Sequence, residues 1–209
     1  MRTLLAVCLL ALSPALTAAE RVVSLAPSMS EIMLELGAES RLVGLLDGGP
    51  RPPALAGVPS VGRYGQVELE TLLALKPDLL LLWPGSVPEA QQAQLRAFGI
   101  PLYVGEPHDL QALAEQFAEV GRLVGAEARG RELRERFITR LADLRQRYRR
   151  EPPLTVFYQV WNEPLYTLGG RQVVSDALRV CGARNVFADL QLPAPVSYTH
   201  LRAHETRGN

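Results

Sequence analysis

The residue types that most often carry catalysis are scarce in this chain of 209 residues, which has three histidines and two cysteines. His108 is the histidine within regularly patterned sequence, and we interpret it as a solvated loop residue rather than the partner of Ser28 in a triad. Motifs of the types G-x-S-x-G, G-x-G-x-x-G and Walker A do not occur. His108 and Cys181 alone are too few to form a metal site closed by nitrogen and sulfur ligands. The carboxylates are not grouped on one loop, as a calcium site would require. The sequence therefore predicts neither an enzyme nor a cofactor or metal site.

Composition narrows the partner classes. Basic and acidic side chains balance at 22 each, so a polyanionic partner such as nucleic acid is not expected. Hydrophobic residues make up 47% of the chain, enough to bury a substantial core. The apolar run nearest to a membrane span in length lies within the first twenty residues, so we expect the mature protein to be soluble and monomeric.

Aromatic and small polar residues follow several apolar extended runs. Ligands in open α/β sheets bind beyond the carboxyl ends of the strands, so residues at these points are binding candidates. Large rings suit this role because they offer wide apolar faces with a polar edge. Ordinary core packing is the alternative for the three rings in this set. The candidates are Pro27, Ser28, Tyr64, Trp83, Trp161 and Asn162.

The elements that must position these residues alternate between strand and helix. Extended runs are predicted at 21–26, 42–46, 58–62, 79–83 and 102–104, and helices at 30–36, 68–75, 88–98 and 110–124. Ser28 and Glu31 have capping-box spacing, and Asp109 is expected to cap the helix that follows it. This alternation predicts an open α/β lobe over residues 20–125.

A long helix should connect this lobe to a second one. Between 127 and 150 the apolar residues form one narrow stripe, which suits a strut across two lobes; a coiled coil is the alternative. The connecting segment is 126–151, and a fresh strand at 155–160 opens a second α/β lobe over 152–197. That stretch is short for a closed sheet, so the second lobe should be incomplete. The stripe consists of Leu133, Phe137, Leu141, Leu144 and Tyr148.

Both termini carry special patterns. Residues 1–19 join Arg2, an apolar block and Thr17-Ala18-Ala19, which is typical of a secretory signal peptide and predicts a periplasmic protein. A buried helix and a lipoprotein cut before Cys8 are weaker alternatives. Residues 198–209 lack strand or helix periodicity and resemble translated adapter sequence, so we interpret them as a non-native tail. Cys181 is then unpaired in an exported chain, which fits a C-terminal truncation.

Five stretches resemble the periplasmic vitamin B12-binding proteins of ABC importers, within the solute-binding proteins that have a helical backbone. The resemblance covers residues 20 to 197. L-x-P-D-L-L is shared with haem and siderophore carriers, whereas Tyr64-Gly65-Gln66, Trp83 and Val-Cys-Gly are closer to the cobalamin group. The stretches are RVVSLAPSMSE (21–31), GRYGQ (62–66), LETLLALKPDLL (69–80), VWNEPLYT (160–167) and VCGARNVF (180–187).

The resemblance implies two Rossmann-like lobes joined by a single long helix, with a flat, amide-fringed corrinoid held between them. It adds Gly65 and Gln66 to the ligand-binding candidates. It implies that Glu70 docks into the permease, for which a solvated carboxylate is the alternative, and that Cys181 is half of a disulfide whose partner is missing. Asp47-Gly48-Gly49 departs from the family, which has a ligand-contacting tyrosine there.

These expectations lead to a function. The sequence predicts an extracytoplasmic solute-binding protein that captures cobalamin, as a transported ligand, and delivers it to an ABC permease. The nearest alternative is a haem or ferric-siderophore carrier. Siderophore sites usually need arginines that face the anionic oxygens of the ligand, and Arg63 and Arg171 are the candidates. An exported α/β hydrolase is a more distant alternative.

Overall fold

The computed structural model describes residues 18–190. The signal-peptide prediction, Cys8 and the predicted tail at 198–209 fall outside this range, apart from residues 18 and 19. Within residues 18–190, no helix has both the length and the apolar character needed to cross a membrane.

The first part of the chain forms a six-stranded sheet in the order β4-β3-β2-β1-β5-β6. All neighbouring strands are parallel except β4, which pairs antiparallel with β3. The α/β class and open parallel sheet predicted from the sequence are confirmed. The strands are β1 Val22–Ser24, β2 Leu42–Asp47, β3 Ser60–Arg63, β4 Gln66–Val67, β5 Leu79–Leu82 and β6 Leu102–Val104.

Helices cover both faces of this sheet. Residues that alternate along the central strands point to opposite faces. Thus Val22 belongs to the core beneath α1 and α4, and Val23 to the core beneath α2 and α3. The helices are α1 Pro27–Glu35, α2 Leu69–Ala74, α3 Glu89–Ala97 and α4 Leu110–Leu123, with short 3-10 turns at Glu39–Arg41 and Pro53–Leu55.

Helix α1 begins earlier than predicted. Its N-cap is Ala26, with no side-chain hydrogen bond, so the capping box of Ser28 and Glu31 is wrong. Pro27 explains the difference, because its fixed φ suits the first helical turn and it has no N–H to satisfy. Asp109 does cap α4, accepting a hydrogen bond from the Ala112 N–H at 2.7 Å.

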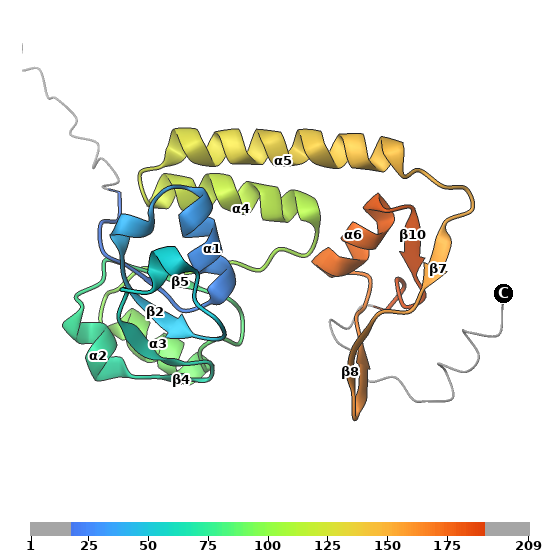
Figure 1. The fold of residues 1–209 in the computed structure, drawn as a ribbon. Coiled ribbons are helices and arrows are strands. Elements are labelled where there is room, and N and C mark those ends of the chain that lie inside the picture. Colours follow the sequence, from blue (N-terminus) through green and yellow to red (C-terminus); the bar gives the residue numbers. More distant parts are fainter. Residues whose placement is uncertain (1–17, 191–209) are drawn as a thin grey trace, which may run out of the picture.

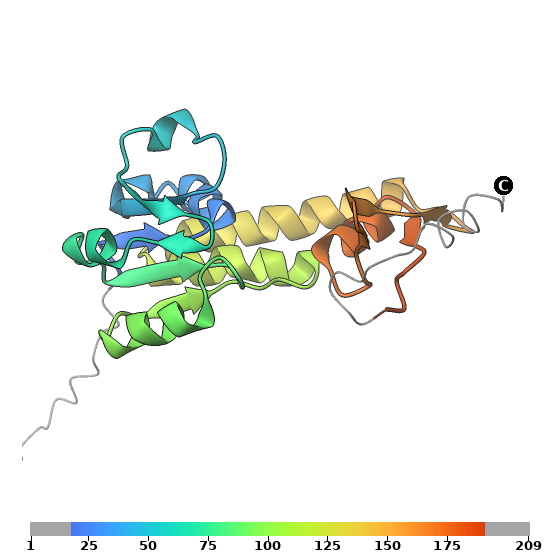
Figure 2. The same cartoon turned by 90° about the horizontal axis from the view of Figure 1, so that it is seen from below.

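Helix α5, Glu127–Arg147, is the long helix that the stripe predicted. It runs alongside α4 and continues beyond it, with the six-stranded sheet below one end and the C-terminal elements below the other (Figure 1). The second view shows the same arrangement (Figure 2). Leu133 and Leu141 are buried, whereas Tyr148, at the end of the stripe, is exposed.

The C-terminal part contains two small sheets and one helix. β7 Leu154–Val156 pairs parallel with β10 Ala183–Asn185, and β8 Gln159–Asn162 forms a hairpin with β9 Leu165–Thr167. Helix α6, Val173–Val180, packs on α4 and α5 through Leu110, Leu141 and Val180.

One strand prediction is wrong here. The run 155–160 is divided between β7 and β8, so Trp161 and Asn162 lie in the hairpin and not at the carboxyl end of the first strand of this part. The turn residues Glu163 and Pro164 return the chain antiparallel along β8, which sequence periodicity alone did not indicate.

Candidate functional site

The topological switch of the large sheet lies at β1, which has β2 on one side and β5 on the other. The chain leaves β1 for β2 and reaches β5 on the opposite side, which opens a crevice at the carboxyl ends of β1 and β5. Ser28 follows β1 and Trp83 follows β5, and both line a cavity of about 400 Å³ there. The structure thus brings together two candidates that are 55 positions apart. Other lining residues are Glu31, Ile32, Leu34, Glu35, Pro107, Leu113, Gln116 and Phe117.

Backbone contacts connect the loops along this edge. The Tyr64 N–H donates to the Asp47 carbonyl at 3.1 Å, and the Gly65 N–H donates to the Ser86 carbonyl at 3.4 Å. The Ser86 hydroxyl in turn donates to the Trp83 carbonyl at 2.8 Å. The tyrosine loop after β3 is therefore held between the loops after β2 and β5.

Two glycines beside Tyr64 and Trp83 adopt backbone conformations that other residues rarely take. Gly65 and Gly85 have φ values of +78° and +81°, which favour glycine. A methyl group on Gly85 would lie 3.7 Å from the Tyr64 hydroxyl. Tyr64 and Trp83 keep 63% and 37% of their surface exposed, so neither ring is an ordinary core residue. Their role as ligand contacts stays a prediction.

Asp47 forms a clasp that sequence reasoning missed. Its carboxylate accepts hydrogen bonds from the Ser60 hydroxyl at 2.6 Å and Arg51 Nε at 2.7 Å. Arg51 also donates to the Val58 carbonyl at 2.6 Å. The Ser60 hydrogen bond, followed by that from Arg51, lowers the pKa of Asp47 below its ordinary value. The i, i+4 spacing gave no signal for this contact, because Asp47 ends β2 and Arg51 lies in the loop that follows, not on a helix.

The clasp shapes a second cavity of about 240 Å³ between α1 and the loop after β2. Pro27 lies against Gly48, where an added Cβ would come within 2.9 Å of the proline ring. Glu31 lines this cavity as well as the Trp83 cavity. Ser28 and Pro27, adjacent in sequence, thus face two neighbouring hollows at one sheet edge.

Gln66 and the two candidate arginines lie elsewhere around the site. Gln66 is on β4, and its Oε1 accepts hydrogen bonds from Arg63 Nε and Nη2 at 3.3 and 3.2 Å. Both side chains line a hollow of about 280 Å³ that also borders Asp47. Arg171 is exposed in the C-terminal part. The guanidinium of Arg63 is thus already hydrogen-bonded to Gln66 within the protein.

Trp161 and Asn162 are on the β8–β9 hairpin, separate from the sheet edge (Figure 1). Trp161 is 61% exposed, and its Nε1–H donates to the Glu163 carbonyl at 3.1 Å. The exposure argues against core packing for this ring too. The structure therefore groups Pro27, Ser28, Tyr64, Gly65 and Trp83, and leaves Trp161 and Asn162 on another element.

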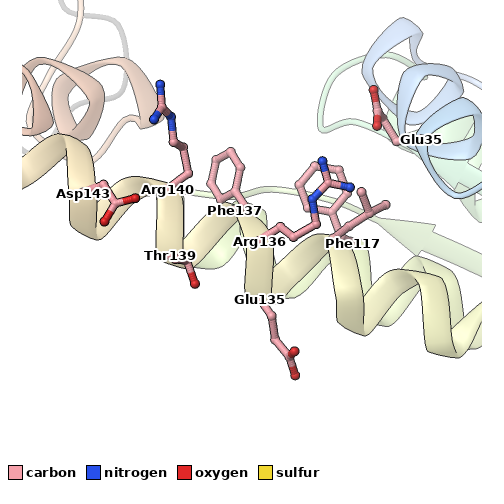
Figure 3. Close-up of a pocket in the computed structure, with 9 residues that line it drawn as sticks. Glu35, Phe117, Glu135, Arg136, Phe137, Thr139, Arg140 and Asp143 are labelled. Atoms are coloured by element: carbon pink, nitrogen blue, oxygen red, sulfur yellow. The ribbon is translucent and has the colours of Figure 1, made fainter.

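A larger hollow of about 820 Å³ extends from α1 onto α5 and is shown in Figure 3. Glu35 and Phe117 line both this hollow and the Trp83 cavity. In Figure 3 Glu35, on α1, lies across from Arg136 and Phe137 on α5. The concave surface thus continues from the sheet edge toward the long helix.

Other functional candidates lie apart from the sheet edge. Glu70 is in the first turn of α2 and is exposed. Cys181 follows α6 as an exposed free thiol. Among residues 18–190, no three His, Cys, Asp or Glu side chains are grouped so that they could hold a metal ion.

Fold and site together define an α/β protein with a ring-bearing hollow at the switch point of its sheet, the architecture of the periplasmic binding proteins. The family model described as periplasmic binding protein matches residues 22–203, and the chain belongs to that family.

Similar proteins carry more specific names. A vitamin B12-binding protein of Yersinia pestis is 33% identical over 178 residues, which are 85% of this chain and 64% of that protein. The chain thus spans less than two thirds of the length of this curated relative. The crystal structure of the periplasmic vitamin B12 binding protein BtuF of Vibrio cholerae matches with a TM-score of 0.79 and 30% identity, over 90% of this chain and 73% of that one.

Haem carriers share the fold as well. A periplasmic heme binding protein from Pseudomonas aeruginosa matches with a TM-score of 0.73 and 28% identity, covering 90% of this chain and 69% of that chain. Both named ligands are flat tetrapyrrole-type macrocycles.

Proposed function

We propose that this protein is an extracytoplasmic solute-binding protein that captures cobalamin and delivers it to an ABC permease. The observation that carries the proposal is the pairing of Ser28 and Trp83 in one cavity at the β1–β5 switch point, with Tyr64 on the adjoining loop. Exposed rings and backbone edges suit a large planar ligand with an amide fringe. The names of relatives at 30–33% identity support the same ligand.

The charge of the site favours cobalamin over haem or a ferric siderophore. Anionic ligands are usually held by free guanidinium groups. Arg51 donates to Asp47 and Val58, and Arg63 donates to Gln66. Among residues 18–190, Arg51 is the one basic residue that lines the two cavities beside Pro27, Ser28 and Trp83, whereas Arg136 and Arg140 line the larger hollow on α5. Haem remains the second candidate because heme binding proteins match the fold at 28% identity.

In this proposal the protein acts as a monomeric carrier in the periplasm and does no chemistry on its ligand. The predicted signal peptide at 1–19 would direct export. The family and its relatives are binding proteins, which supports a carrier rather than a hydrolase.

Equilibrium dialysis against cyanocobalamin and haemin tests the proposed ligand. We expect saturable binding of one cyanocobalamin per chain and weaker binding of haemin. Retention of haemin with no retention of cyanocobalamin would assign the protein to the haem carriers.

We further propose that Glu70 docks on the permease. An exposed carboxylate in the first turn of α2 is placed to form a charge-assisted pair with an arginine of a partner, and such pairs set orientation and encounter rate. Glu70→Gln should reduce cobalamin uptake in reconstituted transport without changing cobalamin affinity. Glu89→Gln, an exposed carboxylate in the first turn of α3, is the matched control. Equal transport by the two variants would contradict the docking role.

A further inference from the structure

Glu31 occupies a central place in the candidate site. It lies on the exposed face of α1, one turn after Ser28, and lines both the 400 Å³ Trp83 cavity and the 240 Å³ cavity of the Asp47 clasp. A ligand that covers the edge of the sheet must therefore pass over this carboxylate.

The surroundings of Glu31 leave its charge uncompensated. Within residues 18–190, its carboxylate forms neither a hydrogen bond nor a salt bridge with another side chain, in contrast to the neighbouring Asp47. In the described part of the chain, Arg51 is the one basic residue that lines the two cavities, and it donates hydrogen bonds to Asp47 and the Val58 carbonyl. Helix α1 packs on β1, β2 and α4. The α4 side chains Leu113 and Gln116, which line the Trp83 cavity, are uncharged and cannot compensate the carboxylate.

A carboxylate acceptor such as Glu31 binds a ligand group that donates a hydrogen bond better than a ligand group that is itself negatively charged. A primary carboxamide can donate an N–H to the carboxylate, and a bond of this kind to an ionised group is stronger than one between neutral groups. A ligand carboxylate at the same place has no proton to donate and meets a like charge in a partly desolvated hollow. Specificity then arises from rejection as well as from attraction.

We propose that Glu31 is a specificity-determining residue that selects a macrocycle with a carboxamide edge and rejects one with carboxylates at that edge. This inference rests on the proposed cobalamin function and adds the feature of the ligand that is read. Cobalamin carries primary amides around its corrin ring, whereas haem carries two propionates, so Glu31 would separate the two ligand classes that share this fold.

Corrinoids that differ by a single group test this role. Mild hydrolysis of cyanocobalamin gives monocarboxylic acids in which one ring amide has become a carboxylate. Isothermal titration of cyanocobalamin and of each separated acid would be carried out with the wild-type chain, Glu31→Gln and Glu39→Gln. Glu39, exposed in the 3-10 turn after α1, controls for the loss of one negative charge on the same lobe. Circular dichroism would confirm that each variant is folded.

We expect the wild-type chain to bind at least one acid about tenfold more weakly than cyanocobalamin, the effect of one unfavourable close charge pair. In Glu31→Gln the ratio should fall to within about twofold, while Glu39→Gln keeps the wild-type ratio. Equal affinity of the wild type for every acid and cyanocobalamin, or an unchanged ratio in Glu31→Gln, would overturn the specificity role. Failure of the wild type to bind cyanocobalamin itself would instead refute the proposed function, and this inference with it.

Discussion

At the residue scale, the site depends on side chains that the fold leaves exposed beside a buried sheet. Leu80, Leu81 and Leu82 of β5 are completely buried, yet Trp83, the next residue, is 37% exposed. Exposing a ring costs hydrophobic free energy that burial would have supplied, so such positions point to binding. The sequence could place Ser28, Tyr64 and Trp83 near this sheet edge, because each comes within two residues of the end of an apolar run. It could not predict that Glu31 lines two cavities there, because that depends on the loop after β2 folding against α1.

Removal of the two rings at the sheet edge should weaken ligand binding without unfolding the protein. The double substitution Trp83→Ala and Tyr64→Ala is expected to lower cobalamin affinity at least about tenfold, since each ring contact is worth about 0.5–1.5 kcal/mol beyond area burial. Calorimetric titration measures the affinity. Phe98→Ala, a 59% exposed ring after α3, is the matched control and should bind normally. Unchanged affinity of the double variant would remove both rings from the site.

Asp47 should titrate below its ordinary value of 3.8. The Ser60 hydrogen bond stabilises the ionised form most, followed by that of Arg51, so the folded pKa is lowered. A lowered pKa means that the clasp contributes stability above pH 3.8 and loses it as the pH falls through the folded pKa. Carboxyl NMR titration should show a midpoint below 3.8 that rises more in Ser60→Ala than in Arg51→Gln. A wild-type midpoint at or above 3.8 would contradict the clasp.

At the element scale, periodicity predicted the large sheet and the helices because their apolar residues pack into the two cores on either side of the sheet. The stripe on α5 is an example, since Leu133 and Leu141 are buried where the spacing placed them. Prediction failed at residues 155–160, which were interpreted as one strand but are divided between β7 and β8, and β8 then pairs with β9 across a turn at Glu163 and Pro164. Local turns of this kind are decided by tertiary pairing, which periodicity does not contain.

The crossing of α4 and α5 depends on two glycines. A Cβ on Gly130 would lie 2.6 Å from the Phe117 carbonyl oxygen, and one on Gly121 would lie 3.0 Å from the Gly130 Cα. Gly130→Ala should gain about 1 kcal/mol from the higher helix propensity of alanine. The new Cβ would press on backbone, which cannot move aside as a flexible side chain can, and overpacking of this kind costs about 1–3 kcal/mol. We expect a net loss of unfolding free energy, measured by urea denaturation.

Gly57→Ala is the control for this substitution, because an added Cβ there has no atom within 4 Å. Its unfolding free energy should stay within about 0.5 kcal/mol of wild type. If Gly130→Ala proved as stable as Gly57→Ala, the close approach of α4 and α5 would not limit their packing.

At the scale of the whole molecule, α5 is the long element that runs from the large sheet to the C-terminal elements (Figure 1). We propose the lobes 20–125 and 152–197 with 126–151 as their connector. Leu110, Leu141 and Val180 form a buried cluster where α4, α5 and α6 meet, and the Asp176 carboxylate accepts a hydrogen bond from the Leu110 N–H at 2.9 Å. These contacts fix the C-terminal elements on the long helix.

A single helical connection held in this way should permit little closure on ligand binding. Small-angle scattering is expected to give the same radius of gyration with and without cyanocobalamin, within experimental error. A large compaction on adding the ligand would show that the connection acts as a flexible hinge.

The most direct test of the central claim uses the two tryptophans of the chain. In the variant Trp161→Phe, Trp83 is the only tryptophan, and its fluorescence reports on the sheet edge at the switch point. Cyanocobalamin absorbs strongly in the region of tryptophan emission, so a corrinoid bound beside Trp83 must quench it. We predict saturable quenching as cyanocobalamin is added, beyond the loss of signal that the absorbance of the added corrinoid causes. A signal that falls only in proportion to the absorbance of the added corrinoid, with no saturation, would contradict a corrinoid site at this edge.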